Sequence, residues 1–286
     1  MDLCDINEIR TILLKNNFKF SKTLGQNFLT ASWVPERIAR ECGAEDAAVL
    51  EVGPGIGCLT AELAKRAKRV IAVELDRALM PVLRETLAGY DNIEILTGDI
   101  LKLDIAKACR EKADGLALVA CANLPYYITT PAITALFEAG VFRYVTVMVQ
   151  KEVADRLASP PGKKAYGAFT VYANYHADVR VLFDVPADCF VPAPKVSSAV
   201  VRFRMREAPP ACVSDREMFF RVVRAAFSQR RKTLANCLSS AFSQTLQKNE
   251  VSDLLNLCGI DPNTRGERLS LEEFAKIADK MKEALV

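Results

Sequence analysis

The chain has very little histidine and no paired cysteine motif. Its 286 residues contain one histidine, His176, and nine singly scattered cysteines, with no CxxC pair and no Cys/His cluster. A structural zinc site is therefore not expected, because such sites need clustered Cys and His ligands. Scattered single cysteines are typical of reduced cytosolic proteins, in which they behave as small buried hydrophobes. His176 stands between a helical and a strand pattern, which indicates a surface or half-buried position rather than catalysis.

Long hydrophobic runs and strong compositional bias are also missing. The longest stretch without a charge, residues 115–137, contains Asn123, Pro125 and Pro131, which favours a strand, a loop and a helix over a membrane span. Acidic residues within the first eight positions argue against a secretory signal or a transit peptide. The ordinary composition excludes disordered, collagen-like and disulfide-scaffold classes. We therefore expect a soluble, cytoplasmic protein without a membrane partner.

Strand and helix patterns alternate over residues 47–203 and predict an α/β domain. Most of the short apolar runs rich in β-branched residues are separated by segments of helical period, which indicates a mostly parallel, Rossmann-like doubly wound sheet. A Pro-rich, non-helical stretch joins the last two runs, so we expect an antiparallel strand at one edge. The seven runs are 49–52, 70–73, 93–96, 116–120, 144–149, 179–183 and 199–203.

A second, all-helical region follows this domain. The strand patterns stop before the sequence APPA at 208–211, which has the composition of a linker. The predicted division is a domain of residues 1–207 and a small helical domain of residues 214–286. In the N-terminal part, Trp33 is expected to pack in the core from the first helix.

Residues 49–57 read VLEVGPGIG, a buried strand that runs into a glycine-rich turn. Gly53, Gly55 and Gly57 permit positive φ angles and a close approach of backbone to ligand. The helix that follows presents free N–H groups to an anion. A dinucleotide fingerprint would need a third glycine where Cys58 stands. The turn is therefore better suited to a ligand with one carboxylate and no diphosphate.

Acidic residues stand at the end of the next strand and just after the one that follows it. Glu74 ends the second strand, 21 residues after Gly53, where a carboxylate can accept from both hydroxyls of a ribose. Asp99 follows the third strand and is placed to accept from an adenine amino group. A tight turn with two surface acids would give the same pattern. The coincidence of the turn and both acids on three successive strand ends favours an adenosine cofactor.

Residues 123–126 read NLPY and follow the fourth strand, at the edge where open α/β sheets bind their substrates. The Asn123 side-chain oxygen and the Leu124 carbonyl can both accept hydrogens from an adenine amino group, which turns the nitrogen lone pair toward a methyl donor. Pro125 stiffens the turn, and Tyr126 can stack on a base removed from its helix. The alternative for this motif alone is an Asn-Pro type of turn with buried tyrosines.

The ordered motifs resemble those of the small-subunit (16S) ribosomal RNA adenine dimethyltransferases, from about residue 20 to residue 271. Loops like NLPY occur in many amino-methyltransferases, whereas the combination with LGQNFL and FVPAPKVSS is far more specific. The motifs are LGQNFL (24–29), EVGPGIG (51–57), VELD (73–76), GDI (98–100), NLPYYITTP (123–131), QKEVADRL (150–157), YGAFTV (166–171), FVPAPKVSSAVVRF (190–203) and AFSQRRKTL (226–234).

This resemblance implies a class I methyltransferase fold, with S-adenosylmethionine as donor, S-adenosylhomocysteine as product and no metal. The implied acceptors are two adjacent adenosines in the 3′-terminal hairpin loop of small-subunit rRNA, each dimethylated at N6 on a pre-30S particle by a monomeric enzyme. The implied donor-binding residues are Gln26, Asn27, Leu29, Glu51, Gly53, Gly55, Glu74, Leu75, Asp99, Ile100 and Asn123. The implied catalytic residues are Asn123, Leu124, Pro125, Tyr126 and Phe190, with Phe190 facing Tyr126 across the target base.

The placement of cations supports an RNA partner, although the net charge of +3 alone does not. Residues 9–35, 189–206 and 218–247 carry four, four and five cations and no acid. One such stretch is usually a solvated face, whereas three of them around one cleft favour a surface that follows phosphates. The predicted RNA-binding residues are Lys22, Lys195, Arg221, Arg224, Arg230, Arg231 and Lys232.

Three other functions share parts of this pattern. An Erm-type large-subunit rRNA methyltransferase, which confers macrolide resistance, would have the same fold, donor site and loop. The motifs FVPAPKVSSAVVRF and AFSQRRKTL favour the small-subunit family instead. A mainly non-enzymatic assembly checkpoint on the immature small subunit is a different class that can coexist with catalysis. A DNA adenine methyltransferase is disfavoured, because the helical domain shows no duplex-reading motif.

Overall fold

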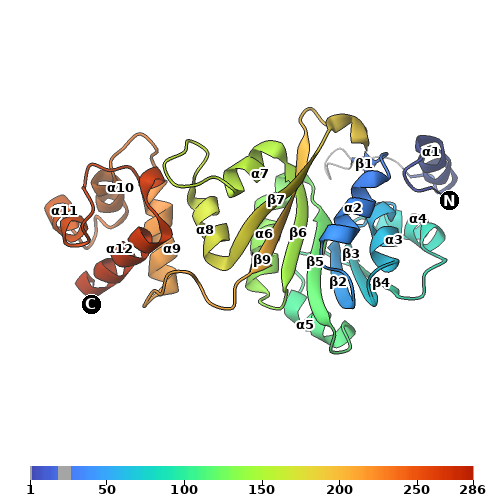
Figure 1. Cartoon of the computed structure of the whole chain (residues 1–286), viewed down its shortest axis with the longest axis horizontal. Helices are drawn as coiled ribbons and strands as arrows, with labels where there is room; N and C mark the ends of the chain where they lie inside the picture. The colour runs from blue at the N-terminus through green and yellow to red at the C-terminus, as the bar shows by residue number, and fades with distance from the viewer. Residues whose placement is uncertain (1, 19–26, 286) are drawn as a thin grey trace. The chain divides into compact units, whose positions relative to one another are not determined.

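The computed structural model describes residues 2–18 and 27–285 (Figure 1). Its packing forms two compact units. The sheet unit consists of residues 1–154 and 180–205, and the helical unit consists of residues 155–179 and 206–286. How these units divide donor binding and RNA binding stays a prediction.

The sheet unit contains a seven-stranded sheet with the order β4-β3-β2-β5-β6-β9-β7. Strands β2 to β6 are parallel to one another, and β9 runs antiparallel to β6. The prediction of a mostly parallel, Rossmann-like sheet with an antiparallel strand toward one edge is confirmed. The strands are β2 (Ala47–Val52), β3 (Arg69–Glu74), β4 (Ile93–Thr97), β5 (Ala117–Asn123), β6 (Tyr144–Gln150), β7 (Ala177–Val185) and β9 (Ser198–Met205).

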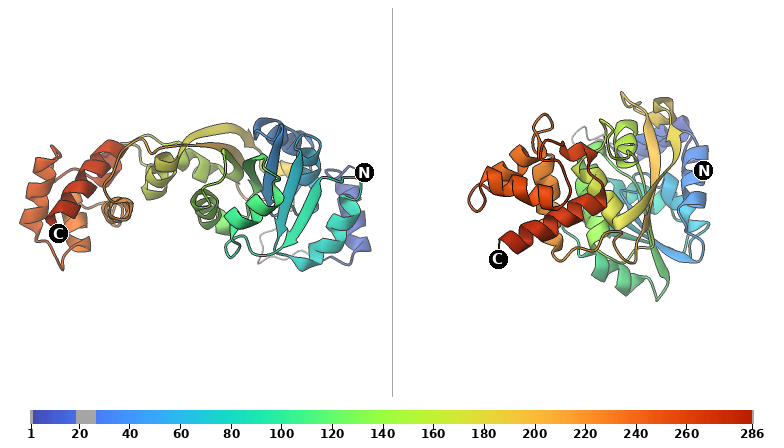
Figure 2. Two further views of the ribbon diagram at one scale, coloured as in Figure 1. Left: turned by 90° about the horizontal axis from the view of Figure 1, so that it is seen from below. Right: turned by 60° about the vertical axis from the view of Figure 1, so that its left-hand side comes forward.

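Helices lie on both faces of this sheet, as the two views in Figure 2 show together. The central strand β2 is buried at every position, because a strand covered on both faces has no solvent side to fill with polar residues. The helices of the sheet unit are α1 (Ile6–Lys15), α2 (Trp33–Glu41), α3 (Cys58–Ala64), α4 (Met80–Thr86), α5 (Ile105–Lys112) and α6 (Thr129–Glu138), and α7 (Lys151–Leu157) begins in this unit and ends in the helical one.

A separate two-stranded sheet joins the N-terminal segment to the connection between β7 and β9. Strand β1 (Phe28–Leu29) pairs antiparallel with β8 (Phe190–Val191), so that Leu29 lies opposite Phe190. This pairing brings Leu29 and Phe190, and with them two sequence motifs that are far apart in the chain, to one place.

The helical unit has its own hydrophobic core, which includes Phe219, Phe242 and Phe274. Tyr166 belongs to the same core, and its hydroxyl donates to the Leu269 carbonyl at 3.0 Å. Val171 and Tyr175 are buried in this core as well, which explains why residues 155–179 pack with the C-terminal helices. The helices are α8 (Ala168–His176), α9 (Arg216–Ala226), α10 (Leu234–Ala241), α11 (Lys248–Leu257) and α12 (Leu271–Ala284). None of the helices in the described part of the chain combines bilayer-spanning length with an apolar composition.

The prediction that Trp33 packs in the core from the first helix is wrong. Trp33 begins α2, the second helix, and 40% of its surface is exposed. The buried stripe of α2 includes Val34 and Ile38, which leaves position 33 at the side of the helix. Its ring instead lies 5.8 Å from that of Phe183, which also packs under the Arg37 guanidinium.

Candidate active site

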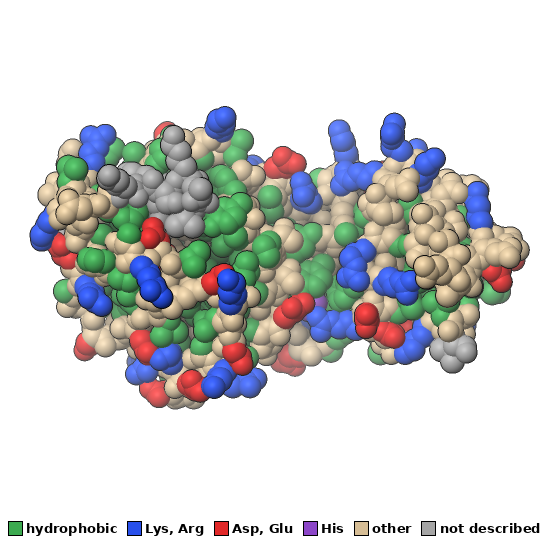
Figure 3. Space-filling view, turned by 180° about the vertical axis from the view of Figure 1, so that it is seen from behind, with side chains coloured by type: hydrophobic (Ala, Val, Ile, Leu, Met, Phe, Trp, Pro, Cys, Tyr) green, Lys and Arg blue, Asp and Glu red, His purple; other side chains and the backbone are tan. Residues whose placement is uncertain are grey.

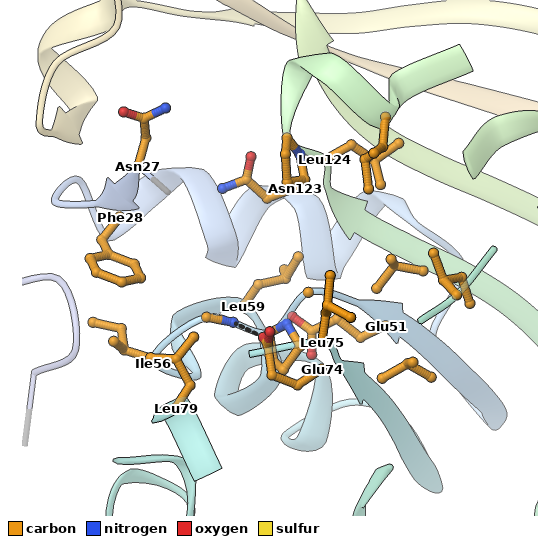
Figure 4. A pocket seen from close by; sticks show the side chains of 18 of the residues that line it. Asn27, Phe28, Glu51, Ile56, Leu59, Glu74, Leu75, Leu79, Asn123 and Leu124 are labelled. Carbon is orange, nitrogen blue, oxygen red and sulfur yellow. Dashed lines mark hydrogen bonds between the residues drawn. The ribbon is translucent and has the colours of Figure 1, made fainter. Parts of the chain in front are cut away.

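A cavity of about 290 Å³ opens at the carboxyl edge of the parallel strands in the sheet unit (Figure 4). The ends of β2, β3 and β5 and the residues that follow them form most of its wall. Strand β2 pairs with β3 on one side and with β5 on the other, so the glycine-rich turn after β2 lies where the strand order reverses. Open α/β sheets bind ligands at this point.

The donor-binding and catalytic residues predicted from the sequence line this one cavity wherever the structure describes them. They are Asn27, Leu29, Glu51, Gly53, Gly55, Glu74, Leu75, Asp99, Ile100, Asn123, Leu124, Pro125, Tyr126 and Phe190. The predicted Gln26 lies outside the described residues. The role of each residue stays a prediction. Donor binding and methyl transfer both require, however, that these residues surround one cavity.

Gly53 and Gly57 of the turn are required for different structural reasons. Gly53 has φ +69° and faces open space, with no atom within 4 Å of the position that a Cβ would take. Gly57 has φ +97°, and a Cβ there would lie 2.9 Å from Leu87 Cδ2. Cys58 stands where a dinucleotide site has glycine, and its Sγ donates to the Leu3 carbonyl at 2.8 Å. The end of the turn is thus held by packing, while Gly53 leaves room for a ligand.

Glu51 is a buried carboxyl group with an unsatisfied oxygen. Only 1% of the residue is exposed, and its Oε2 atom has no hydrogen-bond partner among the described residues. Burial raises the pKa of Glu51 to about 8. The neighbouring Thr60 hydroxyl acts in the opposite direction, and the charge of Glu74 adds a smaller raising contribution. A buried acceptor without a donor is unfavourable. Glu51 is therefore suited to accept from a cationic or N–H group of a bound ligand.

Glu74 is held in place by the backbone around it. Its Oε1 accepts from the Asp76 amide at 2.8 Å, and its Oε2 accepts from the Gly55 amide at 3.4 Å, the dashed contact in Figure 4. Burial raises the pKa of this carboxyl as well. Each carboxylate oxygen can accept more than one hydrogen bond, so both retain capacity for ligand hydroxyls.

The Asp99 side chain hydrogen-bonds to the backbone of the turn in which it lies. Its Oδ1 accepts from the Leu101 amide at 3.0 Å, and its Oδ2 lies 3.8 Å from the Lys102 ammonium. Leu75 and Leu101 also line the cavity, yet 49% and 43% of their surfaces are exposed. Large apolar side chains left open beside a carboxylate offer a surface on which a flat aromatic ring can lie.

The NLPY residues, which we call the acceptor turn (123–126), begin at the last residue of β5. Asn123 projects into the cavity near Asn27, above Glu51 and Glu74 in the view of Figure 4. No described residue hydrogen-bonds to the Asn123 side-chain amide or donates to the Leu124 carbonyl. The Ile128 amide donates to the Pro125 carbonyl at 3.1 Å and closes the turn. Asn123 and Leu124 both line the cavity, so the turn contributes two acceptors there that no described residue uses.

Two aromatic residues complete the acceptor side of the cavity. Tyr126 is partly exposed, and its hydroxyl lies 2.9 Å from the Ser198 hydroxyl. Phe190 is buried and is fixed by the pairing of β8 with β1. Neighbouring Tyr127, with 56% of its surface exposed, also lines the cavity.

The apolar wall was not identified from the sequence. Phe28 and Ile56 lie inside quoted motifs, so their position next to predicted residues was an available signal. Leu59 and Leu79 have the spacing of ordinary core leucines, and nothing in the sequence distinguishes a cavity wall from a core. The cavity residues missed in this way are Phe28, Val52, Pro54, Ile56, Cys58, Leu59, Val73, Leu79, Gly98, Leu101, Tyr127 and Ile128. The only histidine, His176, does not line the cavity.

The predicted RNA-binding cations are exposed wherever the structure describes them. Lys195 belongs to the sheet unit, and Arg221, Arg224, Arg230, Arg231 and Lys232 belong to α9 and the turn after it in the helical unit. Lysine and arginine side chains project along the helical unit in Figure 3. Lys22 lies outside the described residues.

Two of these arginines also have structural contacts. The Arg230 guanidinium donates to the carbonyls of Lys164 and Tyr166, at 3.0 and 3.5 Å, and the Arg221 guanidinium lies 4.2 Å from the centre of the Phe242 ring. At these two positions a substitution therefore removes a contact within the helical unit together with the charge.

Residues 17–283 match the model of the family described as ribosomal RNA adenine dimethylase. A curated relative from Lachnoclostridium phytofermentans, named ribosomal RNA small subunit methyltransferase A, is 45% identical over 99% of each chain. A relative of the same name from Streptococcus pneumoniae is 43% identical, also over 99% of each chain.

Solved structures show the same fold at lower identity. A dimethyladenosine transferase from Plasmodium falciparum has a TM-score of 0.76 at 23% identity, covering 90% of this chain and 98% of that one. The 23S rRNA methyltransferase ErmE has a TM-score of 0.67 at 26% identity, covering 89% of this chain and 99% of that one. The relatives named for the small subunit are thus much more similar in sequence than ErmE is.

Proposed function

Because the chain belongs to the ribosomal RNA adenine dimethylase family, we propose that it dimethylates N6 of two adjacent adenosines in the 3′-terminal hairpin loop of small-subunit rRNA, with S-adenosylmethionine as donor. The observation that carries this proposal is the single cavity shared by the three carboxylates and the acceptor turn. Direct transfer of a methyl group requires that the donor methyl carbon and the acceptor nitrogen are held in contact and aligned in one cavity.

The lining of the cavity fits this donor. S-adenosylmethionine carries an ammonium and a sulfonium cation, and the cavity provides the carboxyl groups of Glu51, Glu74 and Asp99. The unsatisfied Oε2 of Glu51 suits an N–H donor, Glu74 suits ribose hydroxyls, and Asp99 with Leu75 and Leu101 suits an adenine ring. When bound, the donor supplies an electrophilic methyl carbon.

The acceptor turn orients the nucleophile. An adenine amino nitrogen is a poor nucleophile, because its lone pair is delocalised into the ring. If the Asn123 amide oxygen and the Leu124 carbonyl accept its two hydrogens, the nitrogen moves toward tetrahedral geometry and its lone pair points away from the turn. Tyr126 and Phe190 hold the base by stacking. The methylated nitrogen is acidic enough to lose its proton to water.

The exposed cations of the helical unit and Lys195 support an rRNA substrate, since basic side chains track phosphates. We propose that the substrate is rRNA within a pre-30S particle in the cytoplasm and that one copy of the chain acts on it. An Erm-type activity on large-subunit RNA and a purely structural checkpoint role are outcomes that the following experiment separates.

The test supplies purified protein and isotope-labelled donor to small-subunit particles that lack the modification, and separately to naked large-subunit RNA. Mass spectrometry of the digested RNA should find two N6,N6-dimethyladenosines in the 3′ fragment of the small-subunit rRNA only. Label in large-subunit RNA alone would identify an Erm-type enzyme. Particle binding without any methylation, by the wild type and by Asn123→Ala alike, would leave only the checkpoint role.

A further inference from the structure

The Tyr126 hydroxyl of the acceptor turn lies 2.9 Å from the hydroxyl of Ser198, a residue 72 positions later in the chain. Ser198 is the first residue of β9, and only 1% of it is exposed. The positions after it, Ala199, Val200 and Val201, are all buried and apolar. A serine in such a strand loses its hydration on folding, and a buried hydroxyl needs a partner in compensation. Tyr126 is that partner.

The backbone at Ser198 is fixed by the sheet. Ser198 lies opposite Gln150 in the antiparallel pairing of β9 with β6, and the Lys151 amide donates to the Ser197 carbonyl at 2.9 Å. Tyr126, in contrast, belongs to a short 3-10 turn and is partly open to the cavity. The hydroxyl pair therefore links a ring in the cavity to a rigid part of the sheet.

One connection supplies Phe190 and also the serine that fixes Tyr126, so it bears on both aromatic residues of the acceptor side. Residues 190–198 begin with Phe190, which is fixed opposite Leu29 by the pairing of β8 with β1, and end with Ser198, which bonds to Tyr126. Both ends of the connection are thus attached to paired strands. The position of the Tyr126 ring relative to Phe190 then depends on the length and anchoring of this one segment.

We infer that Ser198 is a positioning residue for methyl transfer, and that its hydroxyl holds the Tyr126 ring in the orientation that receives the target base. Ser198 does not line the cavity, so it acts through Tyr126 rather than on the donor or the reacting nitrogen. This inference rests on the proposed function, and it assigns a role to the second serine of the motif FVPAPKVSS.

The test is a double-mutant cycle of Ser198→Ala, Tyr126→Phe and the double variant, assayed on unmodified small-subunit particles. Each single variant should lower kcat between about twofold and tenfold, the range that corresponds to one neutral hydrogen bond. The double variant should be no slower than either single one, because both remove the same bond. The Kd for S-adenosylhomocysteine, measured by calorimetry, should stay unchanged.

Two further variants separate positioning from general support of the fold. Ser198→Thr keeps a hydroxyl and should recover most of the lost kcat. Ser197→Ala is the matched control, since it removes a neighbouring, exposed serine hydroxyl and should behave as wild type. The inference is overturned if Ser198→Ala retains wild-type kcat, if the losses in the cycle are additive, or if donor affinity and melting temperature fall together with kcat.

A readout that needs no activity separates failure of this inference from failure of the proposed function. In protein labelled with ¹³C-tyrosine, the Tyr126 resonance, identified by its absence in Tyr126→Phe, should shift in Ser198→Ala and not in Ser197→Ala. If the wild type methylates no RNA, the proposed function fails even where this shift is seen. If the wild type is active but the resonance does not move, only the role of Ser198 is wrong.

Discussion

Glu51 and Glu74 line the same cavity from adjacent parallel strands, yet only Glu74 has hydrogen bonds from the protein to both of its carboxyl oxygens. Backbone amides of Gly55 and Asp76 bond to Glu74, whereas the Oε2 atom of Glu51 has no partner among the described residues. Glu51 is also the more deeply buried of the two. The difference makes Glu51 the carboxyl group whose protonation depends most on what occupies the cavity.

The stability of the protein should fall as the pH rises from 5 to 8, in part because of Glu51. In the fold this carboxyl keeps its proton up to a pKa of about 8, whereas its ordinary value is 4.5. Between these values the unfolded chain binds fewer protons than the folded one, so the free energy of unfolding decreases with increasing pH. Glu51→Gln cannot ionise and should show a weaker decrease, by on the order of 3 kcal/mol over this range.

Denaturant unfolding of wild type and Glu51→Gln at several pH values measures this difference. The raised pKa of Glu74 is present in both proteins and cancels in the comparison. Glu111→Gln, which changes an exposed carboxyl on α5, is the matched control and should follow wild type. Parallel curves for wild type and Glu51→Gln would show that burial does not hold the proton on Glu51.

Binding of the donor should be coupled to release of a proton from Glu51. A cationic ligand favours the ionised form of Glu51. The affinity of the wild type for S-adenosylmethionine should therefore rise by up to about tenfold from pH 6 to pH 7. This range lies below the ordinary pKa of an α-amino group, about 7.7–8.0, so the ligand keeps its charge. Other groups around Glu51 are Glu74, Cys58 and Cys121, and the raised pKa of each thiol keeps it neutral here.

Calorimetry in two buffers of different ionisation enthalpy gives the number of protons released. Close to one proton is expected for the wild type at pH 6.5, and none for Glu51→Gln. An affinity that does not change with pH in the wild type would mean that Glu51 does not meet the charged end of the donor.

Gly57→Ala should destabilise the sheet unit by about 1–3 kcal/mol. The residue has φ +97°, which disfavours any side chain, and a Cβ would lie 2.9 Å from Leu87 Cδ2. Gly89→Ala is the matched control, because nothing lies within 4 Å of its Cβ position and its φ is not positive. The control should change the free energy of unfolding by less than about 0.5 kcal/mol. Equal values for the two variants would show that the turn relaxes around the added methyl group.

The sheet and most of the cavity could be predicted because their signals are local in sequence. The buried strand β2 is apolar at every position except Glu51. Gly53 and Asp99 lie just after strands, and Glu74 and Asn123 end strands, all at the same edge of the sheet. Parallel strands bring their carboxyl ends together, so the strand pattern places residues that are far apart in the chain.

What could not be predicted depends on contacts between distant segments. The unsatisfied oxygen of Glu51 and the bond between Tyr126 and Ser198 exist only in the folded chain. Trp33 was placed wrongly because a tryptophan in an apolar context is usually buried, and only the orientation of α2 shows that its position lies beside the buried stripe.

The cluster of Arg230, Arg231 and Lys232 should separate into one structural and two RNA-binding residues. Arg230 donates to the carbonyls of Lys164 and Tyr166, so Arg230→Ala should loosen that loop and speed tryptic cleavage after Lys164. Arg231→Ala and Lys232→Ala should leave the cleavage rate at the loop unchanged. Each should instead lower the slope of log K against log salt by about one phosphate contact, and the Arg231→Ala, Lys232→Ala double variant by about two.

Binding of unmodified small-subunit particles, measured between about 50 and 200 mM salt, tests this separation. The tryptic digest is carried out on the same preparations, so that loss of structure and loss of phosphate contact are read independently. Because Arg231 and Lys232 are exposed, substituting them should weaken binding of the particle without lowering the free energy of unfolding. An unaltered salt slope in the Arg231→Ala, Lys232→Ala double variant would mean that these two cations face solvent, and the RNA surface would then have to be sought among Lys195, Arg221 and Arg224.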